Sequence, residues 1–242
     1  MILSGFGDIQ FITNKKIKRI SVKILPESLH VNLPVGKTQK EALEFIETKR
    51  TVILRRQQKL RQGIDNQLII LPQKPLQTLT FLVQPIAVER SDIFFLLKNK
   101  VLTIEFPKEK DYQLPQMQQI FWNGINYFLR KDAKNLLPVR LKQLADLHGF
   151  TFNKVTIKST KSRWGSCATN KKNILQKTYS INLSFYLLLT TIQLIDYVLL
   201  HELCHTREMN HSPRFWALMD KVTNGKYKEL RAELKKYTMP KF

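Results

Sequence analysis

The chain has 242 residues, of which 43% are hydrophobic and 10% aromatic. This composition excludes a disordered chain and allows one large or two modest domains with a hydrophobic core. The formal net charge of +21 is divided between residues 1–110 (+9) and residues 111–242 (+12). A polyanion such as nucleic acid is a natural partner for this charge, and a basic surface that serves only solubility explains it equally well.

The first 110 residues have the patterns of a β-rich part with one helix. Alternating apolar and polar residues at 17–24 and 29–33 predict two antiparallel strands. Thr38 and Glu41 have the spacing of a capping box, which predicts a helix that runs to about Arg61. Residues 79–83 and 101–106 are typical of further strands. We expect residues 1–110 to form a basic N-terminal domain.

Residues 111–242 contain stronger helix signals. Pro115 predicts the start of a long helix, and Pro138 starts or kinks another that ends at Gly149. Residues 155–159 and 174–183 are typical of strands on either side of a loop that contains residues 162–167. Three helices follow, with the second beginning at Pro213 after Ser212 as N-cap and the third, a basic one, near Lys226.

The first of these helices contains the most informative motif, His201-Glu202-Leu203-Cys204-His205. A spacing of four residues places His201 and His205 on one face of a helix, close enough to hold one Zn²⁺, while Glu202 lies where it can reach a water molecule. Apolar residues precede the motif, so two histidines and a carboxylate without a ligand would be costly to bury there. His211 follows at a predicted turn and is a candidate third ligand.

Cys167 and Cys204 are the two cysteines of the chain, so no disulfide framework is expected and a reducing compartment is favoured. The N-terminus lacks a basic segment followed by a long apolar run. The apolar stretch 185–200 contains Gln193 and Asp196 and is too short to span a bilayer. We therefore expect a soluble, cytoplasmic protein that does not enter a membrane.

Four segments in the same order resemble the YgjP-like metallopeptidase family, whose core is related to SprT-like domains. They are Ser162–Cys167, Ile195–Val198, His201–His205 and Asn210–Trp216. The match covers about residues 110–225, and the basic N-terminal strands and helix resemble the family less specifically. The resemblance implies a zincin-like domain over residues 111–242, with zinc bound by His201, His205 and His211 and with Glu202 as catalytic base.

Three histidine ligands would leave zinc an open position for water, as in catalytic sites, whereas a structural site would be closed by a fourth ligand such as Cys204 or Cys167. Arg163 and Trp164 precede the motif helix and are candidate substrate-binding residues. Trp164 is also explained by core packing, and Arg163 by an internal ion pair with a group such as Asp196. Asp196 is in addition a candidate partner of a ligand histidine, and an exposed position explains it equally well. Phe215 and Trp216 are expected in the core.

We therefore predict an α+β protein, with a β-rich N-terminal part followed by a helical zinc-metallopeptidase domain with a small sheet. The predicted activity is hydrolysis of a protein or peptide substrate by a zinc-activated water. The same zinc and glutamate could instead hydrolyse a nucleotide or another phosphoanhydride, with basic residues holding the phosphates. A third interpretation is a nucleic-acid-binding module whose zinc is structural. Lys49, Arg50, Arg55, Arg56, Lys59 and Arg61 are the first candidates for a nucleic-acid surface.

Overall fold

The computed structural model describes residues 2–3, 5–14, 17–25, 27–65, 68–170 and 178–240. Contacts within the chain group it into two compact units, Met1–Gln67 and Leu68–Phe242. The predicted domain boundary lies at residue 110, whereas residues 68–107 share their hydrophobic core with the helices that follow. Helices and small mixed sheets make up both units, so the predicted α+β class is confirmed.

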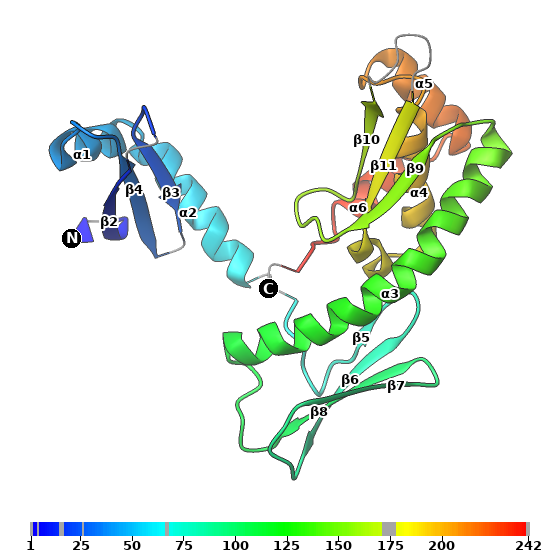
Figure 1. The fold of residues 1–242 in the computed structure, drawn as a ribbon, viewed down its shortest axis with the longest axis horizontal. Coiled ribbons are helices and arrows are strands. Elements are labelled where there is room, and N and C mark those ends of the chain that lie inside the picture. Colours follow the sequence, from blue (N-terminus) through cyan, green and yellow to red (C-terminus); the bar gives the residue numbers. More distant parts are fainter. Residues whose placement is uncertain are drawn as a thin grey trace. The chain divides into compact units, whose positions relative to one another are not determined.

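The first unit is built on a small sheet with its own core. Its strands are β1 (Ile2–Leu3), β2 (Gly7–Thr13), β3 (Ser21–Ile24) and β4 (Ser28–Leu33). They lie in the order β1-β2-β4-β3 (Figure 1). As predicted, β3 and β4 are antiparallel; β2 joins β4 in parallel. Alternate residues of β4, namely Leu29, Val31 and Leu33, are buried against the helices α1 (Gln39–Thr48) and α2 (Arg50–Asp65).

The helix predicted to run from Thr38 to about Arg61 is interrupted at Lys49. Its predicted capping box is present, because Thr38 Oγ1 accepts from the Glu41 amide (3.2 Å) and Glu41 Oε2 accepts from the Thr38 amide (2.8 Å). The interruption has a local cause. The Thr48 hydroxyl donates to the Phe45 carbonyl (2.8 Å), and the Lys49 amide donates to Ile46 (3.1 Å) instead. A side chain thus competes with the helical hydrogen bond and ends α1.

In its described residues, the second unit combines two sheets with a long α-helix, three shorter α-helices and a 3₁₀ helix. The strands are β5 (Leu76–Gln77), β6 (Leu82–Val88), β7 (Phe94–Lys98), β8 (Val101–Pro107), β9 (Lys154–Lys158), β10 (Gly165–Asn170) and β11 (Thr178–Ser184). The helices are α3 (Pro115–His148), the 3₁₀ helix η1 (Phe185–Leu189), α4 (Ile192–Cys204), α5 (Pro213–Val222) and α6 (Tyr227–Leu234). The strand orders are β5-β6-β8-β7 and β10-β11-β9.

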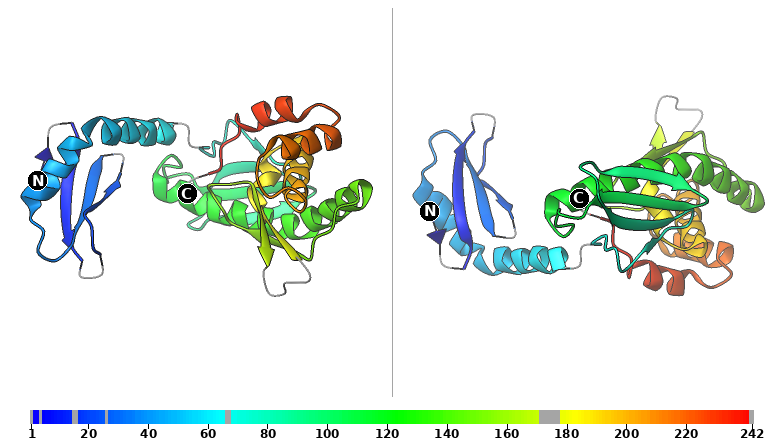
Figure 2. Two further views of the ribbon diagram at one scale, coloured as in Figure 1. Left: turned by 90° about the horizontal axis from the view of Figure 1, so that it is seen from above. Right: turned by 90° about the horizontal axis from the view of Figure 1, so that it is seen from below.

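The sheet β5-β6-β8-β7 covers one side of α3 (Figures 1 and 2). Phe106 of β8 packs against Phe121 of α3, with ring centroids 5.4 Å apart. The predicted strand 101–106 corresponds to β8, but the predicted strand 79–83 overlaps β6 only at its end, because the Phe81 amide donates to the Thr78 hydroxyl (2.9 Å) in a turn.

Helix α3 is continuous through Pro138, so the two helices considered for residues 115–149 form one. Its end at Gly149 is confirmed: Gly149 has φ +67°, a left-handed conformation that glycine adopts without steric cost.

The sheet β10-β11-β9 has an edge strand where the sequence predicts part of a loop. Residues 165–167 lie in β10, where they pair antiparallel with residues 181–183 of β11. Strand β9 confirms the predicted strand 155–159. For the predicted strand 174–183, residues 178–183 lie in β11 and residues 174–177 lie outside the described residues.

Across the part of the chain that the structure describes, no helix combines the length and apolar character needed to cross a membrane.

Candidate metal centre

Helix α4 is a core helix whose last turn carries the HExxH motif. Leu194, Ile195 and Leu199 of this helix are fully buried, which fixes its rotation about its axis. His201 and His205 consequently lie one turn apart on one face, with ring centroids 4.9 Å apart. His205 is the C-terminal cap of α4, so the chain leaves the helix at the second histidine.

The chain then turns back and brings His211 to the helix pair. Ser212 caps α5 by accepting from the Phe215 amide (3.4 Å), and Pro213 occupies the first turn, as predicted. His211 Nε2 lies 3.0 Å from His201 Nε2. One ring nitrogen from each of the three histidines lies within 4.8 Å of the other two. The three imidazoles therefore converge on one point.

Aromatic rings and a backbone carbonyl hold the histidines in place. Phe215 is fully buried and stacks on His205 (centroids 4.6 Å), while the half-buried Trp216 stacks on His211 (5.5 Å). His205 Nδ1 lies 3.1 Å from the Glu208 carbonyl oxygen. A hydrogen donated from Nδ1 to this carbonyl leaves the lone pair on Nε2, the usual arrangement of a ligand histidine.

His201 and His205 are held in the neutral form that can bind a metal. Burial, together with the charges of His205, His211 and Arg231, lowers the pKa of His201 to about 3. Burial also lowers the pKa of His205, against the effect of its hydrogen bond to Glu208. A neutral imidazole offers a nitrogen lone pair, so near neutral pH these side chains need not lose a proton to bind a cation.

Glu202 is buried beside the three histidines, with only 5% of its surface exposed. Burial raises the pKa of Glu202 to about 8, although the charge of Arg163 acts in the opposite direction. Its Oε2 atom is buried without a hydrogen-bond partner among the described residues. Strand β10 approaches the carboxylate so closely that a Cβ atom on Gly165 would lie 2.6 Å from Glu202 Oε1.

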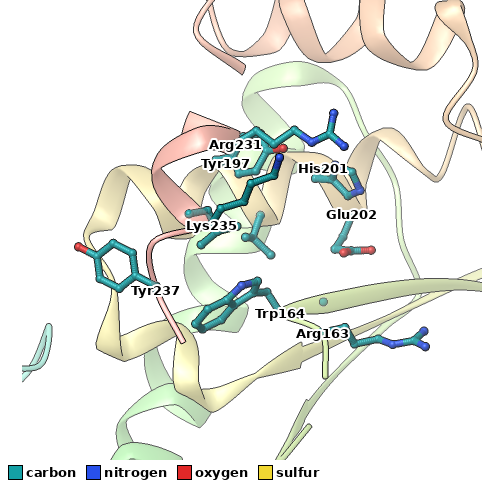
Figure 3. Close-up of a pocket in the computed structure, with 11 residues that line it drawn as sticks. Arg163, Trp164, Tyr197, His201, Glu202, Arg231, Lys235 and Tyr237 are labelled. Carbon is teal, nitrogen blue, oxygen red and sulfur yellow. The ribbon is translucent and has the colours of Figure 1, made fainter. Parts of the chain in front are cut away.

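A pocket of about 370 Å³ opens beside His201 and Glu202 (Figure 3). Its lining residues come from the start of β10 and the segment before it, from α4, and from α6 with the residues after it. They are Arg163, Trp164, Gly165, Tyr197, Val198, His201, Glu202, Arg231, Leu234, Lys235 and Tyr237. The structure thus brings the predicted residues Arg163 and Trp164 to the histidines. Sequence reasoning missed Arg231 and Lys235, for which the only signal was the basic character of the last helix.

Trp164 is half-buried and packs against the core of the second unit, as its packing interpretation predicts, and it also lines the pocket. Asp196 pairs neither with Arg163 nor with a ligand histidine, and it is half-buried rather than exposed. Its carboxylate forms two hydrogen bonds with the Arg140 guanidinium of α3, at 2.7 and 2.6 Å. Within the described ranges, Arg163 has no ion-pair partner.

The cysteines do not complete the cluster. Among the described residues, the group of possible metal ligands contains the three histidines and neither a cysteine nor a carboxylate. Cys167 and Cys204 are free, and burial raises their pKa values to about 11 and about 12. The thiolate form that binds metals is therefore disfavoured at both positions.

Comparisons with known proteins identify the family of the chain. The model of the YgjP-like metallopeptidase domain family matches residues 18–237, which extends the resemblance into the N-terminal part. No curated protein matches. A solved structure, the metallopeptidase zymogen of Pyrococcus abyssi abylysin, is 24% identical, with a TM-score of 0.35, over 42% of this chain and 93% of that chain. The chain belongs to the YgjP-like metallopeptidase family, a family of metal-dependent peptidases.

Proposed function

We propose that the chain is a zinc-dependent peptidase in which His201, His205 and His211 bind the metal and Glu202 is the general base. One observation carries the proposal: three imidazole nitrogens within 4.8 Å of one another lie beside a buried carboxylate with an unpartnered oxygen. His205 and Glu202 are buried and His201 is half-buried. Without a ligand, this burial of polar groups would cost folding free energy, so a cation is the simplest explanation of their convergence.

The residues fit zinc in number and in kind. Imidazole nitrogen is a preferred zinc ligand, and three protein ligands with an open fourth position are typical of catalytic rather than structural sites. Zinc bound there would supply Lewis-acid chemistry, lowering the pKa of a water molecule and polarising the scissile carbonyl. The nucleic-acid module with structural zinc is not favoured, since no fourth ligand joins the histidines among the described residues.

Glu202 is placed to move the proton. Its Oε2 atom, which has no partner among the described residues, would accept a proton from the attacking water and donate it to the leaving amine. Burial raises the affinity of this carboxylate for a proton, which suits a group that works as base and then as acid near neutral pH. Gly165 supports the role, because β10 covers one side of the carboxylate and restricts its rotamers.

Strand β10 is the proposed binding edge for the peptide. It is an edge strand, since β11 is its partner on one side and no described strand pairs with the other. An extended peptide adds to such an edge by main-chain hydrogen bonds, which positions a scissile bond without requiring a particular sequence. Arg163 and Trp164 lie immediately before β10 and line the pocket, so we propose that they contact the substrate.

Cleavage of casein or unstructured peptides by the purified protein tests the proposal. We expect a chelator to abolish cleavage and zinc to restore it. His211→Ala should lower zinc content and, because metal binding is coupled to folding, the Tm. His30→Ala, on β4 of the first unit, is the matched control and should leave zinc content unchanged. Full zinc occupancy in His211→Ala would remove His211 from the ligand set.

A second activity is favoured by one observation: three basic side chains, Arg163, Arg231 and Lys235, line the pocket. Hydrolysis of a phosphoanhydride would use the same zinc and Glu202, with these cations holding phosphate oxygens. Phosphate release from nucleoside triphosphates by the wild type, lost in Glu202→Gln, together with failure to cleave any peptide, would establish this activity in place of peptide hydrolysis.

A further inference from the structure

Helix α6 presents two cations to the pocket beside the histidines. Arg231 and Lys235 are four residues apart, which places them on the same side of the helix end, and both line the pocket together with Leu234 (Figure 3). Arg231 is held by an aromatic contact, since its guanidinium carbon lies 4.9 Å from the centroid of Trp216. Trp216 in turn stacks on His211. One chain of contacts thus links Arg231 to the histidine cluster.

These cations are not neutralised within the described part of the chain. Neither Arg231 nor Lys235 forms an ion pair there, and both side chains are exposed to solvent. Glu202 is the one acidic residue that lines the pocket, and it is buried on the far side of His201 from α6 (Figure 3). The α6 side of the pocket therefore presents positive charge that an incoming group can pair with.

Part of the pocket wall is apolar. The rings of Trp164 and Tyr197 and the side chain of Val198 contribute to it, with Tyr197 and Val198 each 4% exposed. A ligand that fits this arrangement has an apolar stem along the wall and an anionic end at Arg231 and Lys235. Glutamate and aspartate side chains have this form, and so does the C-terminal residue of a peptide.

We propose that Arg231 and Lys235 form a carboxylate subsite that selects peptides with an acidic side chain, or a free C-terminus, beside the scissile bond. This specificity rests on the proposed peptidase function. A phosphate fits the subsite less well, because phosphate sites commonly use backbone amides at the start of a helix. The helical residues that line the pocket all lie beyond the first turn of α4 or α6.

Peptide binding to zinc-loaded Glu202→Gln measures the subsite without turnover. Fluorescence anisotropy would compare peptides that differ only by Glu or Gln, and otherwise identical peptides that end in a carboxylate or an amide. We expect the charged member of one pair to bind about tenfold more tightly, the size of one charge-assisted hydrogen bond. The pair that shows the difference identifies the source of the carboxylate. Equal affinity within both pairs would overturn the proposal.

Substitutions in and after α6 test whether Arg231 and Lys235 cause the preference for the charged peptide. In the Glu202→Gln background, Arg231→Gln and Lys235→Gln should each lower affinity for the charged peptide and leave that for its neutral counterpart within about twofold. Lys236→Gln, which removes the next charge along the chain but does not line the pocket, is the matched control and should retain the preference. Zinc content and Tm identify any variant that has not folded, and Arg231→Lys should restore part of the preference.

The two proposals fail in different ways. If the wild type cleaves no peptide while Glu202→Gln still binds acidic peptides through Arg231 and Lys235, the peptidase function fails and the subsite stands. If the wild type cleaves peptides but acidic and neutral ones equally, the subsite fails and the peptidase function stands. Tight binding of nucleoside triphosphates that depends on Arg231 and Lys235, without binding of acidic peptides, would overturn the carboxylate assignment.

Discussion

Gly165 and Glu202 lie in direct contact across the candidate active site. A Cβ atom at position 165 would come within 2.6 Å of Glu202 Oε1, 2.7 Å of Cγ and 2.9 Å of Cδ. These separations are too short for any side chain, so the missing Cβ of Gly165 is what lets β10 pass over the glutamate. The contact links the proposed peptide-binding edge to the proposed general base.

Gly165→Ala should therefore displace Glu202 while the histidines stay in place. The added methyl group must push either the strand or the carboxylate, and overpacking of this kind costs about 1–3 kcal/mol of stability. We expect hydrolytic activity to fall by at least about tenfold at unchanged zinc content, because a misplaced base loses its alignment with the water. Activity assays with zinc analysis on the same sample provide the measurement.

Ala168→Ser is the control for Gly165→Ala, since it adds one atom to an exposed position of the same strand. It should leave both activity and zinc content near the wild-type values. Wild-type activity in Gly165→Ala would show that the contact does not position Glu202.

The ion pair between Arg140 and Asp196 joins α3 to the helix that carries His201 and His205. The two side chains are 35% and 23% exposed and are joined by two hydrogen bonds. Asp196→Asn and Arg140→Gln should each lower the free energy of unfolding by about 1–3 kcal/mol, as expected for hydrogen bonds between charged groups. Denaturant unfolding of both single variants and the double variant measures the coupling.

The Lys142–Asp146 pair on the same helix is the matched control. Its side chains are 65% and 60% exposed, and Lys142→Gln should change stability by less than about 1 kcal/mol because solvent screens such pairs. Strictly additive effects of Arg140→Gln and Asp196→Asn would contradict a direct stabilising interaction.

Local signals in the sequence predicted much of the fold. The capping box of Thr38 and Glu41, the Ser212-Pro213 helix start and the left-handed Gly149 each depend on a few neighbouring residues, and all three are present. The same holds for the histidine motif, because helical periodicity alone places His201 beside His205. Local structure that depends only on residues within one helical turn can therefore be predicted from a short segment of the sequence.

The features that the sequence did not reveal depend on distant partners. Strand β10 contains Gly165, Ser166 and Asn170, which are weak strand formers, and its pairing with β11 outweighs that preference. Asp196 pairs with Arg140, 56 residues earlier, and no spacing rule connects them. The position of α6 beside the histidines likewise follows from packing across the whole second unit, so Arg231 could not be assigned to the pocket from sequence.

The basic first unit is the place to test for nucleic-acid binding. Residues 1–67 contain 13 Lys and Arg against six Asp and Glu. Arg55 and Arg56 are exposed on α2, whereas the side chains of Lys59 and Arg61 lie outside the described residues. If this face binds phosphates, affinity for DNA or RNA should fall steeply between about 50 and 200 mM salt, because each neutralised phosphate releases counterions. Anisotropy titrations over this range provide the measurement.

Replacing Arg55, Arg56 and Lys59 by Ser should weaken binding and flatten its salt dependence. A control variant removes three exposed charges from the second unit, at Lys131, Lys134 and Lys158, and should retain the wild-type slope. If the wild type binds neither DNA nor RNA at the lowest salt concentration, the positive charge does not serve nucleic-acid binding.

Glu202→Gln separates the proposed role of Glu202 as general base from its contribution to the fold. The substitution preserves the shape of the side chain but removes its capacity to accept a proton. It should also be tolerated structurally, because an uncharged amide replaces a carboxylate whose charge is costly to bury. We therefore expect wild-type zinc content and an unchanged fold.

The decisive measurement is kcat/KM for peptide hydrolysis by wild type and Glu202→Gln at matched zinc content. Loss of a general base typically costs on the order of 10²–10⁴-fold in rate, and we predict a loss in this range. A value within a few-fold of wild type, with zinc bound in both proteins, would contradict the assignment of Glu202 as the base.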